Sequence, residues 1–68
     1  MNTALFRSIM VLHGDTNESL ANYLKLSPQS VCNKINENGT EFKQGEIALI
    51  KERYDLTPEQ ISDIFFAK

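Results

Sequence analysis

The sequence lacks the features that mark secreted and membrane proteins. Cys32 is its one cysteine, so no internal disulfide can form, which fits a reducing compartment. No apolar run approaches the roughly 18 residues that a membrane span needs. The stretch MNTALFRSIM carries one positive charge and no small-residue cleavage site, so we expect no signal peptide. These absences together predict a cytoplasmic protein.

Residues for catalysis or metal binding are equally scarce. His13 has no second histidine, cysteine or paired carboxylate at ligand spacing, so neither a zinc site nor a nucleophile–base pair can be assembled. The sequence contains no glycine-rich phosphate loop. We therefore expect no enzymatic activity, no metal and no cofactor. Cys32 is interpreted as structural, and His13 as a favourable contact with a helix dipole.

The length and the apolar spacing predict one small all-α domain, residues 1–68. A chain of this length buries only about 60% of its unfolded surface, so its stability should be marginal unless it dimerises. No stretch alternates well enough for a strand, whereas apolar residues recur at helical spacing. The predicted fold is a compact bundle of five short helices, over residues 3–13, 17–24, 28–35, 44–54 and 58–65 or 66.

Start signals support the helix boundaries. Thr16 and Ser27 are expected caps of the second and third helices, and Pro28 fits the first turn of the third. Thr57 with Gln60 forms a capping box, which makes the fifth helix the clearest start in the sequence. The three later starts share the spacing of a hydrophobic staple. The staple pairs are Leu26 with Val31, Phe42 with Ile47, and Leu56 with Ile61.

Residues 17–36, NESLANYLKLSPQSVCNKIN, read as two short helices joined by a tight turn. Apolar residues of the pair face inward at helical spacing, and four polar side chains of the second helix face outward. The inward set is Leu20, Ala21, Leu24, Leu26, Val31 and Ile35, and the outward set is Gln29, Ser30, Asn33 and Lys34.

This pattern resembles the helix-turn-helix of the Xre-like family, the small phage Cro and repressor domains. The apolar–alanine pair is Leu20-Ala21, and the polar helix that follows Ser27 has Val31 as its apolar anchor. The later run KIN..GTEFKQGEI..I....LTPEQISDIFF also looks like short phage-encoded members, so the resemblance extends from about residue 5 to 66. Two positions depart from the pattern: Asn17 stands where glutamine is common, and Lys25 where glycine is usual.

The resemblance implies a lambda-repressor-like fold. It also implies a sequence-specific DNA-binding transcriptional regulator of phage or prophage type, closer to a Cro-like protein than to a full-length repressor, in the cytoplasm of a bacterial cell or a phage-infected host. The third helix would enter the major groove, where a side-chain amide discriminates adenine by roughly 1–3 kcal/mol. Base-reading residues would be Gln29, Ser30 and Asn33. Phosphate contacts are expected from Asn17, Lys34, Thr40 and Lys43. The alternative is that all of these are ordinary solvated residues.

The charge leaves a second functional class open. A net charge of −2 does not favour a nucleic-acid partner, although the excess acid lies in residues 44–68, away from the expected reading face. Weak non-specific DNA binding is therefore predicted. The alternative function is a protein–protein interaction module on the same scaffold, which the acidic balance permits.

The C-terminal segment is more apolar than one short helix can hide. We infer a homodimer contact at Ile64, Phe65 and Phe66, with a simple core role as the alternative. A two-fold dimer would place two recognition helices about 34 Å apart and match a palindromic operator in double-stranded DNA.

Overall fold

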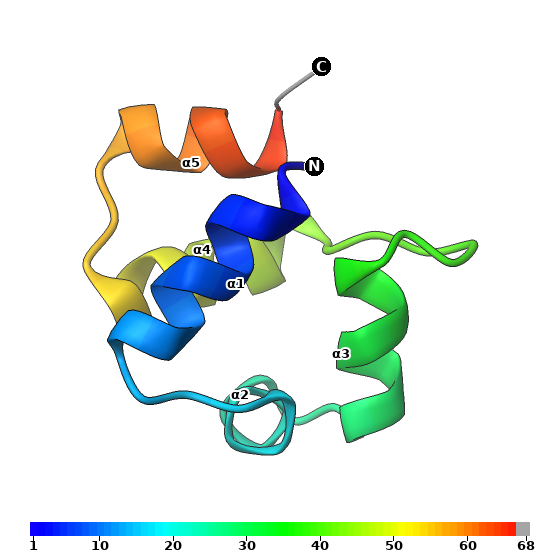
Figure 1. The fold of residues 1–68 in the computed structure, drawn as a ribbon. Coiled ribbons are helices and arrows are strands. Elements are labelled where there is room, and N and C mark those ends of the chain that lie inside the picture. Colours follow the sequence, from blue (N-terminus) through cyan, green and yellow to red (C-terminus); the bar gives the residue numbers. More distant parts are fainter. Residues whose placement is uncertain (67–68) are drawn as a thin grey trace.

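The computed structural model describes residues 1–66, which form five α-helices and no strand (Figure 1). Their Cα radius of gyration, 10.8 Å, is that of a folded domain of this length. The predicted compact all-α bundle is confirmed, and every helix agrees with its expected range to within one residue. The helices are α1 Thr3–Leu12, α2 Asn17–Leu24, α3 Pro28–Ile35, α4 Gln44–Tyr54 and α5 Pro58–Phe65.

The helices begin where the capping signals predict. The side chains of Thr16, Ser27 and Thr57 each accept a bond at 3.1 Å from the backbone N–H three residues on. Lys43, before α4, has no oxygen to offer as a cap. Instead the Glu46 carboxylate accepts the backbone N–H of Lys43 at 2.9 Å, which satisfies one donor at this helix start.

Helices α2 and α4 end in the same way, with a left-handed residue. Lys25 has φ 59° and Asp55 has φ 52°. In both cases the next N–H bonds back to the carbonyl five residues earlier, at 2.9 Å, which closes a Schellman motif. A lysine in this conformation carries strain of about 1–2 kcal/mol that glycine would avoid. The turn between α2 and α3 therefore forms even though Lys25 is unfavourable at this position.

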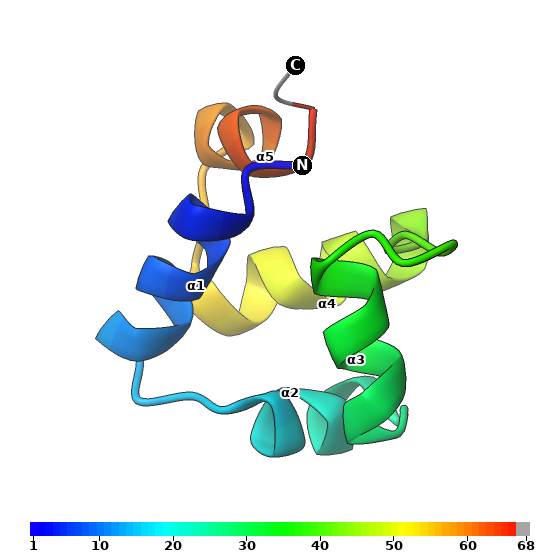
Figure 2. The ribbon, with the colours of Figure 1, turned by 45° about the vertical axis from the view of Figure 1, so that its right-hand side comes forward.

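The core is centred on Phe6, which is fully buried on α1. Its ring packs against Phe42, Tyr54 and Phe65, with centroids 5.7, 6.3 and 5.8 Å away. Helix α1 lies between α5 at one end of the molecule and α2 at the other, and α3 stands on the opposite side from α1 (Figures 1 and 2). Within residues 1–66 no helix has the length and apolar character needed to cross a membrane.

Candidate nucleic-acid interface

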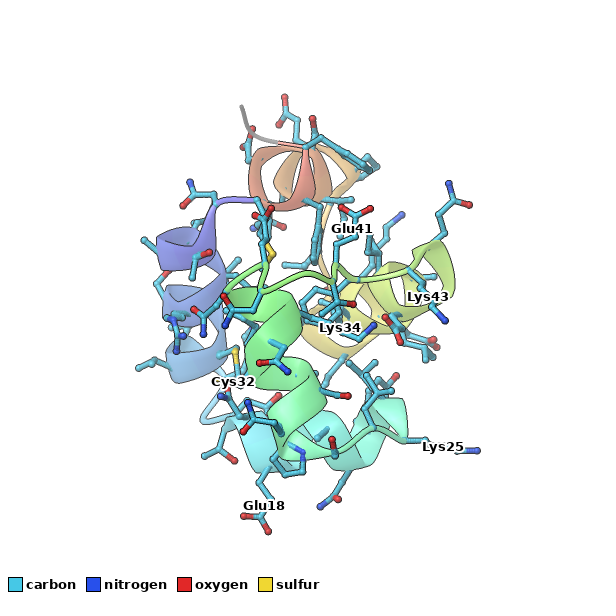
Figure 3. All side chains as sticks on the ribbon, turned by 90° about the vertical axis from the view of Figure 1, so that its right-hand side faces the viewer. Glu18, Lys25, Cys32, Lys34, Glu41 and Lys43 are labelled. Carbon is cyan, nitrogen blue, oxygen red and sulfur yellow. The ribbon has the colours of Figure 1, made fainter. Side chains whose placement is uncertain are left out.

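One side of α3, which we call its committed side, is buried against the rest of the molecule, and the other side is open to solvent. Val31 and Ile35 are fully buried against the other helices. Gln29 is exposed, and Ser30 and Asn33 are partly exposed. We call these last three residues the outer face of α3. Figure 3 looks at the side of the molecule on which α3 lies, so this helix is in front of the core.

The two carboxamides of the outer face are joined. Gln29 Nε2 donates to Asn33 Oδ1 at 3.1 Å, one helical turn further along. Ser30 lies between them in sequence, at a part-buried position. The three residues that sequence reasoning grouped as base-reading are therefore on one helix, with both amides toward solvent.

Lys34, the next residue along α3, does not face solvent as the sequence pattern predicted. Its side chain is only 8% exposed, and its Nζ lies 3.0 Å from Glu46 Oε1 and 3.3 Å from the carbonyl oxygen of Glu41. Figure 3 shows Lys34 directed toward α4. The prediction of a phosphate contact is therefore wrong for Lys34, because its ammonium already joins α3 to the start of α4.

The Glu46 carboxylate is ionised in this arrangement. Burial raises its pKa, but the N–H of Lys43 and the ammonium of Lys34 outweigh that effect and hold the pKa of Glu46 below its usual value. One carboxylate thus caps α4 and fixes α3. We refer to Lys34 and Glu46 as the α3–α4 ion pair.

The other expected phosphate-contact residues are accessible. Thr40 and Lys43 are exposed, and Asn17 is partly exposed at the first position of α2. Figure 3 shows Lys43 projecting from the same side of the molecule that presents α3. Their role in DNA binding stays a prediction.

Two exposed cations near α3 were missed as candidates. Lys25, in the turn before α3, projects outward in Figure 3. Arg7 on α1 donates to Asn36 Oδ1 at 3.2 Å, directly after the last turn of α3. The position of Lys25 beside the turn was available in the sequence, but that of Arg7 depends on how α1 packs.

Acidic side chains lie on the same side of the molecule. Figure 3 shows Glu18 below α3 and Glu41 above it, and both are exposed. Glu37 is bonded to the amino terminus at 2.7 Å. Among residues 1–66, the surroundings of the outer face are therefore of mixed sign, with no continuous basic stripe.

A second polar cluster joins the start of α2 to α4. Asp15, just before α2, accepts bonds from Arg53 Nε at 2.7 Å, Arg53 Nη2 at 2.9 Å and the Tyr54 hydroxyl at 2.5 Å. It also accepts a bond from Ser19 Oγ. The Arg53 guanidinium lies over the Tyr23 ring, 4.7 Å from its centroid. We call this group the Asp15 clamp, since it joins the start of α2 to the end of α4.

The contacts of the Asp15 clamp favour the charged form of Asp15. The Arg53 guanidinium, assisted by the Ser19 and Tyr54 hydroxyls, holds the pKa of Asp15 well below its usual value against the opposing effect of burial. Burial and the neighbouring carboxylate raise the pKa of Tyr54. Asp15 and Arg53 are far apart in sequence, and no local pattern predicted that they pair.

The expected dimer residues occupy three different environments. Ile64 is fully buried in the core of its own chain, so its assignment to a dimer contact is wrong. Phe65 is partly buried beside Phe6 and Phe42, with centroids 5.8 and 5.9 Å away. Phe66 is 65% exposed. A hollow of about 240 Å³ next to it has a mixed lining, apolar from Phe42, Ile47, Phe65 and Phe66 and polar from Glu37, Glu41 and Gln44.

Comparison of the chain with protein-family models, with curated proteins and with solved structures found no significant match. The likeness to the Xre-like family therefore depends on the sequence pattern.

In residues 1–66, no three histidine, cysteine, aspartate or glutamate side chains gather where they could hold a metal ion.

Proposed function

We propose that the protein is a sequence-specific DNA-binding transcriptional regulator of phage or prophage type, without catalytic activity. In this proposal α2 and α3 act as a helix-turn-helix, and α3 enters the major groove. The observation that carries it is the outer face of α3, where Gln29 and Asn33 present carboxamides to solvent on a helix fixed from behind. Such amides pair with the edges of adenine.

The contacts that fix α3 to the rest of the molecule favour this function, because a loosely held surface helix could not place its side chains accurately. Val31 and Ile35 fill the core, and the α3–α4 ion pair fixes the C-terminal half of the helix. The Asp15 clamp holds the start of α2. Base recognition requires side chains placed to about half an ångström, which a rigid support of this kind provides.

Phosphate contacts come from a small number of cations. Lys25, Lys43 and Arg7 are exposed around α3, and Thr40 and the N–H groups at the start of α2 near Asn17 add uncharged donors. Because Glu18 and Glu41 lie among them, we propose that non-specific affinity is weak and that specific contacts decide binding.

We propose further that the protein binds a palindromic operator in the cytoplasm as a two-fold homodimer. With Ile64 excluded, the contact consists of Phe65 and the exposed Phe66, beside the hollow described above. The substitution Phe66→Ser should lower the molar mass measured by sedimentation equilibrium from that of a dimer to that of a monomer. It should also weaken binding to a two-fold symmetric site. A wild-type monomer at all concentrations would remove this part of the proposal.

Selection from a random duplex pool tests the function. We expect enrichment of one short motif, repeated with two-fold symmetry, and an affinity for it that falls steeply with salt. Each phosphate neutralised contributes about −0.9 to the slope of log K against log salt concentration. A pool that shows no enrichment after repeated rounds would contradict the proposal.

A protein–protein interaction module is the second candidate. The net charge of −2 and the exposed Phe66, beside a hollow lined by both apolar and acidic side chains, favour it. The two candidates differ in how binding depends on salt. DNA binding releases counterions and weakens steeply with salt, whereas contact through Phe66 and the apolar part of the hollow weakens much less.

A further inference from the structure

We propose that Gln29 and Asn33 read DNA as one unit, which recognises an adenine followed by a base that offers a hydrogen-bond acceptor in the major groove. In this unit Asn33 positions the Gln29 carboxamide in addition to making its own contact. The inference depends on the proposed function and specifies the DNA sequence class that the outer face of α3 selects.

The direction of the bond between the two amides carries the argument. Gln29 Nε2 is the donor and Asn33 Oδ1 the acceptor, at 3.1 Å. Within residues 1–66 neither amide has another hydrogen-bond partner. Gln29 therefore keeps its acceptor Oε1 and one Nε2 hydrogen, whereas Asn33 keeps both hydrogens of Nδ2 and one of the two lone pairs of Oδ1.

These unused groups match particular bases. Adenine presents the N6 donor and the N7 acceptor side by side, which fit the free Oε1 and Nε2 hydrogen of Gln29. The Nδ2 group of Asn33 can only donate, which fits O6 or N7 of guanine or O4 of thymine on the next base pair. If Asn33 donated to Gln29 Oε1 instead, one of the two lone pairs of Oε1 would be occupied and both Nε2 hydrogens would stay free, which would shift the preference of Gln29 toward guanine, a base that presents only acceptors.

The bond also restricts the side-chain freedom of an exposed glutamine. A free glutamine samples many rotamers and loses that freedom when it binds, whereas a glutamine already held by Asn33 loses less. The preference for adenine at the pair contacted by Gln29 should therefore depend on Asn33, which does not contact that base pair.

Three single variants and the double variant with alanine at both positions test this dependence. Asn33→Asp is the matched control, because aspartate keeps an acceptor for Gln29 Nε2 but has no Nδ2. The readout is the ratio of affinities for the selected site and for each single-base-pair variant of it. We expect Gln29→Ala to reduce a preference of about tenfold at its base pair to near unity. Asn33→Ala should reduce that same preference several-fold.

Asn33→Asp should keep the preference at the base pair of Gln29, lose the one at the next base pair, and weaken binding to all sequences because of its charge. The inference would be overturned if Asn33→Ala left the preference at the Gln29 base pair unchanged, with the two substitutions acting independently in the double variant. Selection of guanine rather than adenine at that position would also overturn it.

The pairing can be followed without DNA. In the free protein, the side-chain amide signals of Gln29 in a ¹⁵N–¹H NMR spectrum should shift in Asn33→Ala and stay near their wild-type positions in Asn33→Asp. If the protein selects no DNA sequence, the proposed function and this inference fall together. If it selects a sequence but the two amides act independently, this inference alone fails.

Discussion

The two sides of α3 differ more than their composition suggests. Asn33 and Lys34 are adjacent polar residues, yet Asn33 faces outward with Gln29 while Lys34 is buried on Glu46. Successive helical residues are rotated by about 100°, so one step along the chain separates an open position from a committed one. Residue type alone therefore does not distinguish a base-reading residue from one that fixes the helix.

This comparison separates stability from recognition. Substitutions on the committed side should lower the free energy of unfolding, and substitutions on the outer face should leave it unchanged and alter DNA selectivity. A domain of this size has a total stability of roughly 3–10 kcal/mol, so losses on the committed side are easily measured.

The largest effect is expected at Ile35, which is fully buried. Ile35→Ala removes packed atoms and leaves a cavity, which should cost about 2–5 kcal/mol in urea unfolding. The matched control is Gln29→Ala on the opposite side of the same helix, which should change stability by less than about 0.5 kcal/mol. Similar losses in both variants would contradict the two-sided description of α3.

The second-largest effect is expected at Asp15. The Asp15 side chain is 4% exposed, and Asp15→Asn leaves the Arg53 guanidinium without its carboxylate, at a cost of about 2–3 kcal/mol near neutral pH. Because the folded pKa is lowered, the stabilisation is complete above the ordinary value of 3.8 and is lost as pH falls below it.

Urea unfolding of wild type and Asp15→Asn at neutral pH and at strongly acidic pH measures this pH dependence. The difference between the two proteins should shrink in acid. A difference that is independent of pH would mean that the Asp15 charge contributes little, and that the hydroxyl contacts hold α2 instead.

The α3–α4 ion pair sharpens the comparison further. Lys34→Met keeps the aliphatic packing but leaves the Glu46 carboxylate without its cation, which should cost about 1–3 kcal/mol. Adding Glu46→Gln should recover part of this loss, since glutamine still accepts the Lys43 N–H and carries no charge.

The salt dependence of DNA binding distinguishes Lys34 from an exposed lysine. Lys43→Ala should reduce the slope of log K against log salt by about 1, whereas Lys34→Met should leave the slope unchanged. If Lys34→Met reduced the slope as Lys43→Ala does, the original assignment of Lys34 to phosphate would be restored.

The smallest effect is expected in the turn before α3. Lys25 has a left-handed backbone, so Lys25→Gly should relieve strain and raise stability by about 0.5–1 kcal/mol, after allowing for the greater flexibility of glycine when unfolded. Lys25→Ala removes the same charge without relieving the strain and serves as the control. Equal stability of these two variants in thermal unfolding would contradict the strain at this position.

The helices could be predicted because their signals are local. Ser27 with Pro28, and Thr57 with Gln60, specify helix starts through contacts within four residues, and the structure has those contacts. Even the start of α4, where Lys43 cannot cap, was predictable from Glu46 three residues later. Local capping and apolar spacing are enough to divide this chain into its five elements.

The candidate site could be predicted only in part, because it depends on contacts between distant residues. Lys34 looked like a surface lysine until folding brought Glu46 beside it. Ile64 looked available for a partner, but its position beside the start of α1 makes it a core residue, with its carbonyl accepting the Asn2 N–H at 2.6 Å. The Asp15 clamp has no sequence signal because its pairing is set by the packing of α4.

The central claim is that the outer face of α3 contacts base edges in DNA. Titration of the ¹⁵N-labelled protein with its selected duplex tests this claim most directly, through the side-chain amide signals of Gln29 and Asn33. We predict that these signals shift strongly with the selected duplex and much less with a scrambled one. Unchanged amide signals on α3, with shifts confined to residues around Phe66, would contradict the claim.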